Sequence, residues 1–190
     1  MSRLRQSSIL LVAIVVGFAF GATDQYLGSR VITLGLWAAT VSQLSASWLV
    51  LAFVFGYTQT RPGRAALVGL VATLAGLAGY FAMMWSPVEG VPFGQFAAQW
   101  PTLLASQWLN IAGGLLTGPL FGFLGHRWRT RRWWPSAALV AGAICLEPAA
   151  RWVTGRLLPP DFVWGIEVVV GLALVLVFGI LTMTRRRQIS

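Results

Sequence analysis

The chain has 190 residues, of which 57% are hydrophobic and only 10% are charged, and it carries a formal net charge of +9. About a quarter of the residues of an ordinary soluble domain are charged, so this composition excludes a water-soluble globular protein. The positive charge does not predict nucleic-acid binding, because the arginines stand in short clusters beside apolar runs, where anionic inner-leaflet lipid is the expected partner.

The first apolar stretch follows Arg3 and Arg5 and has the layout of a signal peptide. The small residues Gly21 and Ala22, which would mark a cleavage site, are followed at once by Asp24. We expect an uncleaved membrane span over residues 8–26. Its removal would leave five spans and break the alternation of charge along the chain.

Six segments are long and apolar enough to cross a bilayer, which takes roughly 20 residues. They predict an all-α polytopic membrane protein, a single domain over residues 1–190 built as a bundle of six transmembrane helices. Residues 28–43 are too short to span beside the next helix, so they are expected to form an interfacial amphipathic helix or a re-entrant piece. The predicted spans are residues 8–26, 44–59, 65–85, 102–124, 134–154 and 162–183.

The charged residues are divided between the connections in a regular way. All fourteen basic residues are arginines, and eleven of them fall at the two termini and in the second and fourth connections. An excess of arginine on the cytoplasmic side is the usual rule for membrane proteins. It predicts that both termini are cytoplasmic in the cell membrane. The eleven are Arg3, Arg5, Arg61, Arg64, Arg127, Arg129, Arg131, Arg132, Arg185, Arg186 and Arg187, whereas the acids Asp24, Glu89, Glu147, Asp161 and Glu167 lie in or beside the other connections.

Small residues recur every four positions on two of the predicted spans. This spacing forms a smooth stripe along a helix, on which another backbone can approach closely inside a bilayer. The stripes are predicted to be helix-packing faces within the bundle, with a docking face for a partner subunit or a second copy as the alternative. The residues concerned are Ala13, Gly17 and Gly21 on the first span, and Gly114, Gly118 and Gly122 on the fourth.

Polar side chains gather in the outer half of the predicted bundle. Glu147 precedes Arg151 by four residues, so the two share a helix face and are placed to form an ion pair. One reading is that they only neutralise each other, and that Asp24 and Glu167 only lie at helix ends. The other is that these groups converge on an outward-facing pocket, since charged residues within a span usually face a cavity, a partner or the bundle interior. The predicted ligand-binding residues are Asp24, Gln107, Asn110, Glu147, Arg151 and Glu167.

Motifs for enzymatic or cofactor chemistry are missing. The chain has one histidine, His126, and one cysteine, Cys145, which predicts no metal site. It has no lysine, so a phosphate-binding loop of the Walker type is excluded. We expect no catalytic residues, no metal and no cofactor.

Several short stretches resemble a family of uncharacterised six-span membrane proteins from high-GC actinobacteria, known only as a domain of unknown function. The exclusive use of arginine fits such a source. The resemblance implies a membrane location and no known activity. The stretches are 17–24 (GFAFGATD), 45–53 (SASWLVLAF), 61–66 (RPGRAA) and 118–122 (GPLFG), together with Glu147.

The predicted architecture is also similar to the substrate-binding subunits of energy-coupling-factor transporters, which have six spans and cytoplasmic termini. That resemblance implies a ligand site in the outer half and a partner docked on the first span. The family's face there is Ala-x-x-x-Ala, whereas this chain has Ala13, Gly17 and Gly21. The polar groups of the outer half predict a small-molecule binding or transport component. Its site would bind a cationic or polyhydroxylated ligand, relay protons, or meet a ligand carboxylate or phosphate through Arg151. The alternative is a non-catalytic structural or assembly factor for another membrane protein.

Overall fold

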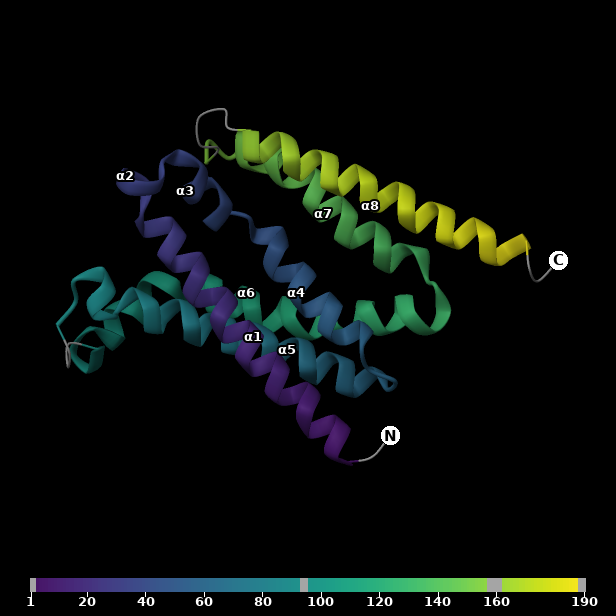
Figure 1. The fold of residues 1–190 in the computed structure, drawn as a ribbon, viewed down its shortest axis with the longest axis horizontal. Coiled ribbons are helices and arrows are strands. Elements are labelled where there is room, and N and C mark those ends of the chain that lie inside the picture. The colour runs from purple at the N-terminus through teal and green to yellow at the C-terminus, as the bar shows by residue number, and fades with distance from the viewer. Residues whose placement is uncertain (1–2, 93–95, 157–161, 188–190) are drawn as a thin grey trace.

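Helices account for all the regular structure in the computed structural model, which describes residues 3–92, 96–156 and 162–187 (Figure 1). The described helices are α1 (Arg3–Ser29), α2 (Val31–Leu34), α3 (Leu36–Ser42), α4 (Ser45–Tyr57), α5 (Pro62–Met84), α6 (Phe96–Arg131), α7 (Trp134–Val153) and α8 (Phe162–Arg187), with one 3₁₀ turn, η1 (Pro87–Glu89).

Five helices, α1, α5, α6, α7 and α8, contain a described segment long and apolar enough to cross a membrane. A sixth candidate span exists if α3 and α4, whose axes meet at 47°, are counted as one broken helix. The prediction of an all-helical chain is confirmed, with five or six candidate spans in the described ranges. The predicted span 44–59 needs correction: α4 has only 13 residues, so it reaches a membrane-spanning length only together with α3.

Residues 28–43, expected to form an interfacial amphipathic helix or a re-entrant piece, contain two short helices, α2 and α3, which are separated at Gly35. Gly35 has φ +90°, a backbone conformation that residues other than glycine rarely adopt, and the chain turns sharply there. The turn directs α3 back toward the bundle, where it leads through Gln43 and Leu44 into α4.

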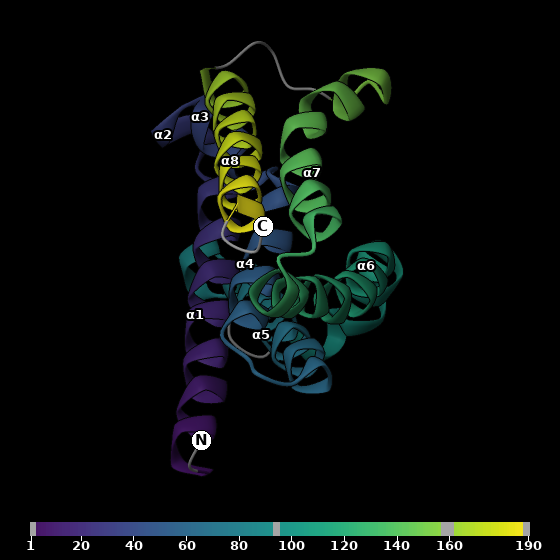
Figure 2. The same cartoon turned by 90° about the vertical axis from the view of Figure 1, so that its right-hand side faces the viewer.

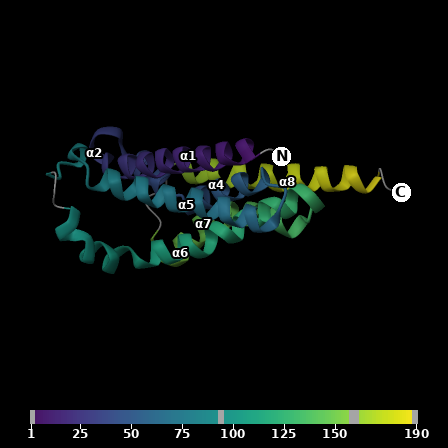
Figure 3. The same ribbon diagram turned by 90° about the horizontal axis from the view of Figure 1, so that it is seen from below.

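The helices are not all parallel, and α1 crosses α5 and α6 at a large angle (Figures 1 and 2). Figure 3 shows them lying lengthwise, and Figure 2 looks almost along α5 and α6 while α1 runs steeply across them. The N-terminal end of α1 and the C-terminal end of α8 lie at the same end of the molecule as the α4–α5 and α6–α7 connections (Figure 1). This is the arrangement that the alternation of arginine and acid along the chain requires.

The first small-residue stripe lies against α5. A methyl group on Gly17 would overlap the carbonyl oxygen of Ala72, and one on Gly21 would overlap that of Gly76. Ala13, one turn earlier, is fully buried. Since lipid removes the hydrophobic drive between helices, this close backbone approach is the main attraction available to α1 and α5.

The second stripe lies against α5 and α4. A methyl group on Gly114 or Gly118 would press against the side chain of Thr73, and one on Gly56 of α4 would overlap the carbonyl oxygen of Gly122. α6 is therefore held to two neighbours over its second half. Neither stripe is open to a partner in this arrangement, because other helices of the same chain occupy it.

The outer surface of the bundle is apolar. In the candidate span of α8 only 11% of the residues are buried, and Val169, Leu176 and Met183 are each about two-thirds exposed. A water-facing helix would not carry such residues, whereas lipid accommodates them at no cost. α8 touches the bundle mainly through α7, and Phe178 meets Trp128 of α6 with ring centroids 4.8 Å apart.

Gly21→Ala is predicted to lower the free energy of unfolding by about 1–3 kcal/mol, because the added methyl forces α1 away from α5. Gly142→Ala is the matched control: it also lies inside a long helix, but nothing lies within 4 Å of the added atom. It should be neutral or stabilising by up to ~1 kcal/mol. Equilibrium unfolding in mixed micelles measures both, and equal effects would contradict the packing described for α1.

Candidate functional site

The site is organised around the break between α3 and α4. The first amides of any helix have no partner within that helix, and in lipid no water replaces the missing partner. Here the carboxylate of Glu147, on α7, accepts hydrogen bonds from the backbone N–H groups of Ser45 and Ala46, each at 2.7 Å. Both carboxylate oxygens thus serve the N-terminus of α4, where a negative charge is also favoured by the helix dipole.

Arg151 completes the same arrangement from one turn further along α7. Its guanidinium forms an ion pair with Glu147 at 2.7 Å, donates to the carbonyl oxygen of Gln43, and donates to the Ser45 hydroxyl at 2.9 Å. It also lies 5.7 Å from the ring centre of Trp164 on α8. The pair therefore satisfies backbone groups on both sides of the break and connects α7 to α4.

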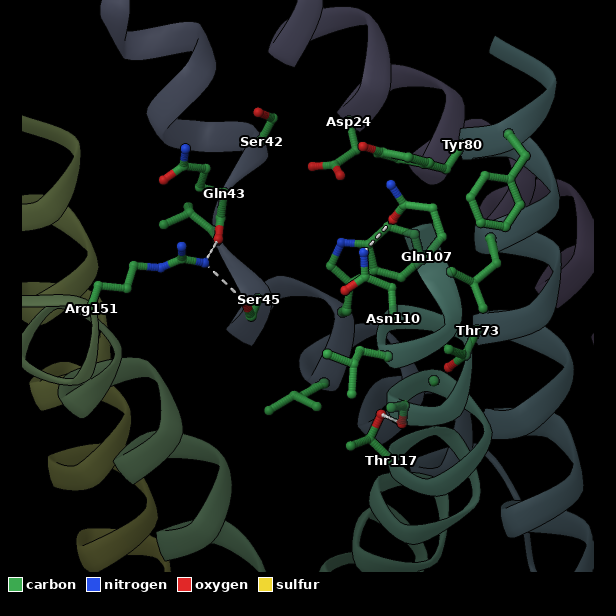
Figure 4. Close-up of a pocket in the computed structure, with 18 residues that line it drawn as sticks. Asp24, Ser42, Gln43, Ser45, Thr73, Tyr80, Gln107, Asn110, Thr117 and Arg151 are labelled. Carbon is green, nitrogen blue, oxygen red and sulfur yellow. Dashed lines mark hydrogen bonds between the residues drawn. The ribbon is translucent and has the colours of Figure 1, made fainter. Parts of the chain in front are cut away.

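A cavity of about 390 Å³ lies beside this break (Figure 4). This volume is at the small end of the range for ligand pockets in proteins. Its walls come from α1, α3, α4, α5, α6 and α7. The lining residues are Asp24, Ser42, Gln43, Leu44, Ser45, Trp48, Leu49, Thr73, Leu77, Tyr80, Phe81, Gln107, Leu109, Asn110, Gly113, Gly114, Thr117 and Arg151.

One wall carries a buried carboxylate among aromatic rings. Asp24 is 8% exposed and accepts a hydrogen bond from the side chain of Trp48. Its carboxylate and the hydroxyl of Tyr80 point toward each other (Figure 4). Trp48 packs edge-on against Phe20, with ring centroids 5.1 Å apart, which fixes the position of the indole beside Asp24.

The opposite wall is uncharged and lies on α6. The amide of Asn110 donates to the side-chain oxygen of Gln107 at 2.5 Å, so the two form one unit that faces the cavity (Figure 4). This pairing leaves the Asn110 oxygen as an acceptor and the Gln107 nitrogen as a donor. The hydroxyl of Thr117, two turns further along α6, donates a hydrogen bond to the carbonyl oxygen of Gly113 at 2.8 Å.

The structure brings together four of the six predicted ligand-binding residues: Asp24, Gln107, Asn110 and Arg151 all line the cavity. Glu147 does not line it, because both of its oxygens are turned to the start of α4. Asp161, which was expected in or beside an outer connection, lies outside the described residues.

Glu167 lies elsewhere, in an apolar groove of about 970 Å³ lined by α1, α3, α4, α7 and α8. It is 6% exposed, and neither carboxylate oxygen has a hydrogen-bond partner. Glu147 and Arg151 are close enough to interact with its charge. In the described part of the chain, no three side chains of histidine, cysteine, aspartate or glutamate are grouped so that they could hold a metal ion.

The sequence analysis did not predict several of the residues that line the cavity, above all Trp48 and Thr73. Thr117 on α6 could have been predicted, because its spacing places it on the same helix face as Gln107 and Asn110, which were predicted. Trp48 gave no such signal, because an isolated tryptophan in an apolar run is indistinguishable from one that faces lipid.

Glu147→Gln is predicted to lower the free energy of unfolding by about 3–5 kcal/mol, since it removes the ion-pair partner of the Arg151 side chain, which is only 18% exposed. The substitution also turns one carboxylate oxygen into an NH₂ group, which is a donor and cannot accept the backbone N–H that this oxygen binds. In equilibrium unfolding, the double variant Glu147→Gln/Arg151→Met should lose much less than the sum of the two single variants. Additive losses would show that the two side chains do not act together.

Comparison with known proteins identifies one family. A family model described as "Family of unknown function (DUF6518)" matches residues 2–190, essentially the whole chain. No curated protein and no solved structure matches the chain. The expectation of a family without assigned function, based on short stretches such as 17–24 and 118–122, is thereby confirmed. The chain belongs to DUF6518, a family of unknown function.

Proposed function

We propose that this protein is a multi-pass component of the cell membrane that binds a small polar molecule in the cavity between α1, α4, α5 and α6. One observation carries the proposal: a cavity of about 390 Å³ in an otherwise apolar bundle is lined by a carboxylate, a guanidinium, three amides and several hydroxyls. Polar groups within membrane spans are costly, and they are retained where they face a cavity or a functional pathway.

The cavity lies toward one end of the bundle. Asp24 is near the C-terminal end of α1, and Arg151 is near the C-terminal end of α7. With six spans and the arginine-rich connections inside, both ends face the outside of the cell. The proposed site therefore captures its ligand from outside, and transport would then require α6 and α7 to rearrange around Pro119 and Pro148, each of which removes one backbone hydrogen bond.

The alternative, an assembly factor that docks another membrane protein through the small-residue stripes, gains less support. A partner could reach Gly17 and Gly21 only by displacing α5, and Gly122 only by displacing α4 and α5. The exposed apolar face of α8 is what a lipid-facing helix needs, so it does not by itself require a protein partner.

Reporter fusions test the orientation. Fusions after Arg64 and after Arg131 are predicted to report the cytoplasmic side, and a fusion after Glu89 the outside, because the arginine clusters stay inside. A periplasm-active reporter and a cytoplasm-active one at the same three positions serve as mutual controls. An outside signal at Arg64 or Arg131 would reverse the proposed topology.

Filling the cavity tests ligand binding. Gly113 lines the cavity, and nothing lies within 4 Å of a Cβ added there, so Gly113→Phe places a ring in the cavity without a clash at the backbone. Saturation-transfer NMR with a panel of small polar molecules, on protein in lipid nanodiscs, should detect bound members with the wild type and none with Gly113→Phe.

Gly142→Phe is the matched control for this experiment. Gly142 is also a helix glycine with nothing within 4 Å of an added Cβ, but it lies on α7 outside the cavity. It should keep the wild-type binding pattern. Binding that survives Gly113→Phe would place the ligand elsewhere, and the absence of any bound molecule in the wild type would remove the support for a binding protein.

A further inference from the structure

We infer that the cavity selects small organic cations: an ammonium group lies against Asp24, and a polar tail faces Gln107 and Asn110. This inference rests on the proposed function and adds the chemical class of the ligand. It follows from the balance of charge on the cavity walls, from the side chains around the carboxylate, and from the character of the opposite wall.

Two charged side chains line the cavity, and only one of them lacks an opposite charge. Arg151 has Glu147 at 2.7 Å, and the same guanidinium nitrogen donates to Gln43 and Ser45. This is the only ion pair within the described ranges, so Asp24 has no basic partner there. Its hydrogen bond from Trp48 supplies a dipole and not a charge.

Because Glu147 balances the charge of Arg151, the uncompensated charge that faces the cavity is the carboxylate of Asp24. An isolated carboxylate in a medium of low dielectric constant is strongly destabilised, and a cation beside it removes that cost. An anion would meet Asp24 as a like charge and would find Arg151 already engaged by Glu147. A neutral polyol could bond to Asp24, but it would leave the charge uncompensated.

The surroundings of Asp24 suit an organic cation in particular. The rings of Trp48, Tyr80 and Phe81 line the same part of the cavity, and Tyr80 and Phe81 pack edge-on with centroids 5.7 Å apart. Ammonium groups are attracted to the faces of aromatic rings, most strongly to tryptophan. A bare metal cation would instead need several oxygen ligands, and the cavity places only one carboxylate there.

The opposite wall sets the rest of the ligand. The Asn110 oxygen and the Gln107 nitrogen are left over from their mutual hydrogen bond, so they can bond to a hydroxyl or an amide. The cavity volume of about 390 Å³ limits the ligand to a small molecule. An amino alcohol or an aromatic amine with a hydroxyl group has this combination of charge, size and polar tail.

The test uses charge-matched sets of ligands on the full chain in lipid nanodiscs. One set is tyramine, its alcohol analogue tyrosol and the acid hydroxyphenylacetate; a second is aminobutanol, butanediol and hydroxybutyrate. We expect saturation-transfer NMR to show binding of the ammonium member in at least one set, with a dissociation constant about tenfold or more below that of the neutral member.

Asp24→Asn should abolish this preference, bringing the affinity for the ammonium member to within about threefold of that for the neutral one, since an amide keeps the shape but carries no charge. The matched control is Glu89→Gln, an acid outside the cavity, which should leave the preference unchanged. Both variants are neutral isosteres, and their unfolding temperatures check that they remain folded.

The remaining outcomes separate this inference from the proposed function. If only neutral or anionic members bind, and Gly113→Phe abolishes that binding, the cavity is a binding site but not for cations. An ammonium preference that persists in Asp24→Asn would also overturn the inference. If no member of either set binds to the wild type, the inference and the proposed function both lose their support.

Discussion

The break between α3 and α4 imposes the condition on which the rest of the bundle depends. A helix interrupted at membrane depth exposes backbone donors and acceptors, and lipid provides no hydrogen-bond partners for them. Glu147 accepts from the amides of Ser45 and Ala46, while Arg151 donates to the carbonyl of Gln43 on the other side. One ion pair from α7 thereby stabilises a bend of 47° and holds α7 to α4. Without it, the cavity would lose the wall formed by Ser42, Gln43 and Ser45.

Close helix packing around α5 determines where the cavity lies. Glycine allows α1 to approach α5 at Gly17 and Gly21, and allows α6 to approach α4 and α5 at Gly122. In the first half of α6, Trp108 and Leu109 are 58% and 64% exposed. The space between this half of α6 and the bent pair is the cavity, so tight packing at one end of the bundle and a bend at the other produce it together.

Some parts of the site follow from local rules, and others do not. The Glu147–Arg151 pair follows from a spacing of four residues on a helix, and the stripe of Gln107, Asn110 and Thr117 has a helical period. The sequence does not predict that this pair binds the start of α4, because Ser45 lies about a hundred residues earlier in the chain. Likewise Asp24 and Glu167 look equivalent in sequence, yet one faces a polar cavity and the other an apolar groove.

The sequence alone determines that this is a helical membrane protein, because 57% hydrophobic residues in runs of about twenty leave no soluble alternative. The arginines predict which connections share a side of the membrane, and the glycines indicate which helix faces can pack closely. Only the tertiary structure decides that α3 and α4 form one bent unit. A helix break is stable only where a distant segment supplies hydrogen-bond partners for its free backbone groups. The tertiary structure decides as well that Glu147 supports the fold while Asp24 faces the cavity, because the role of a buried charge depends on its neighbours in space.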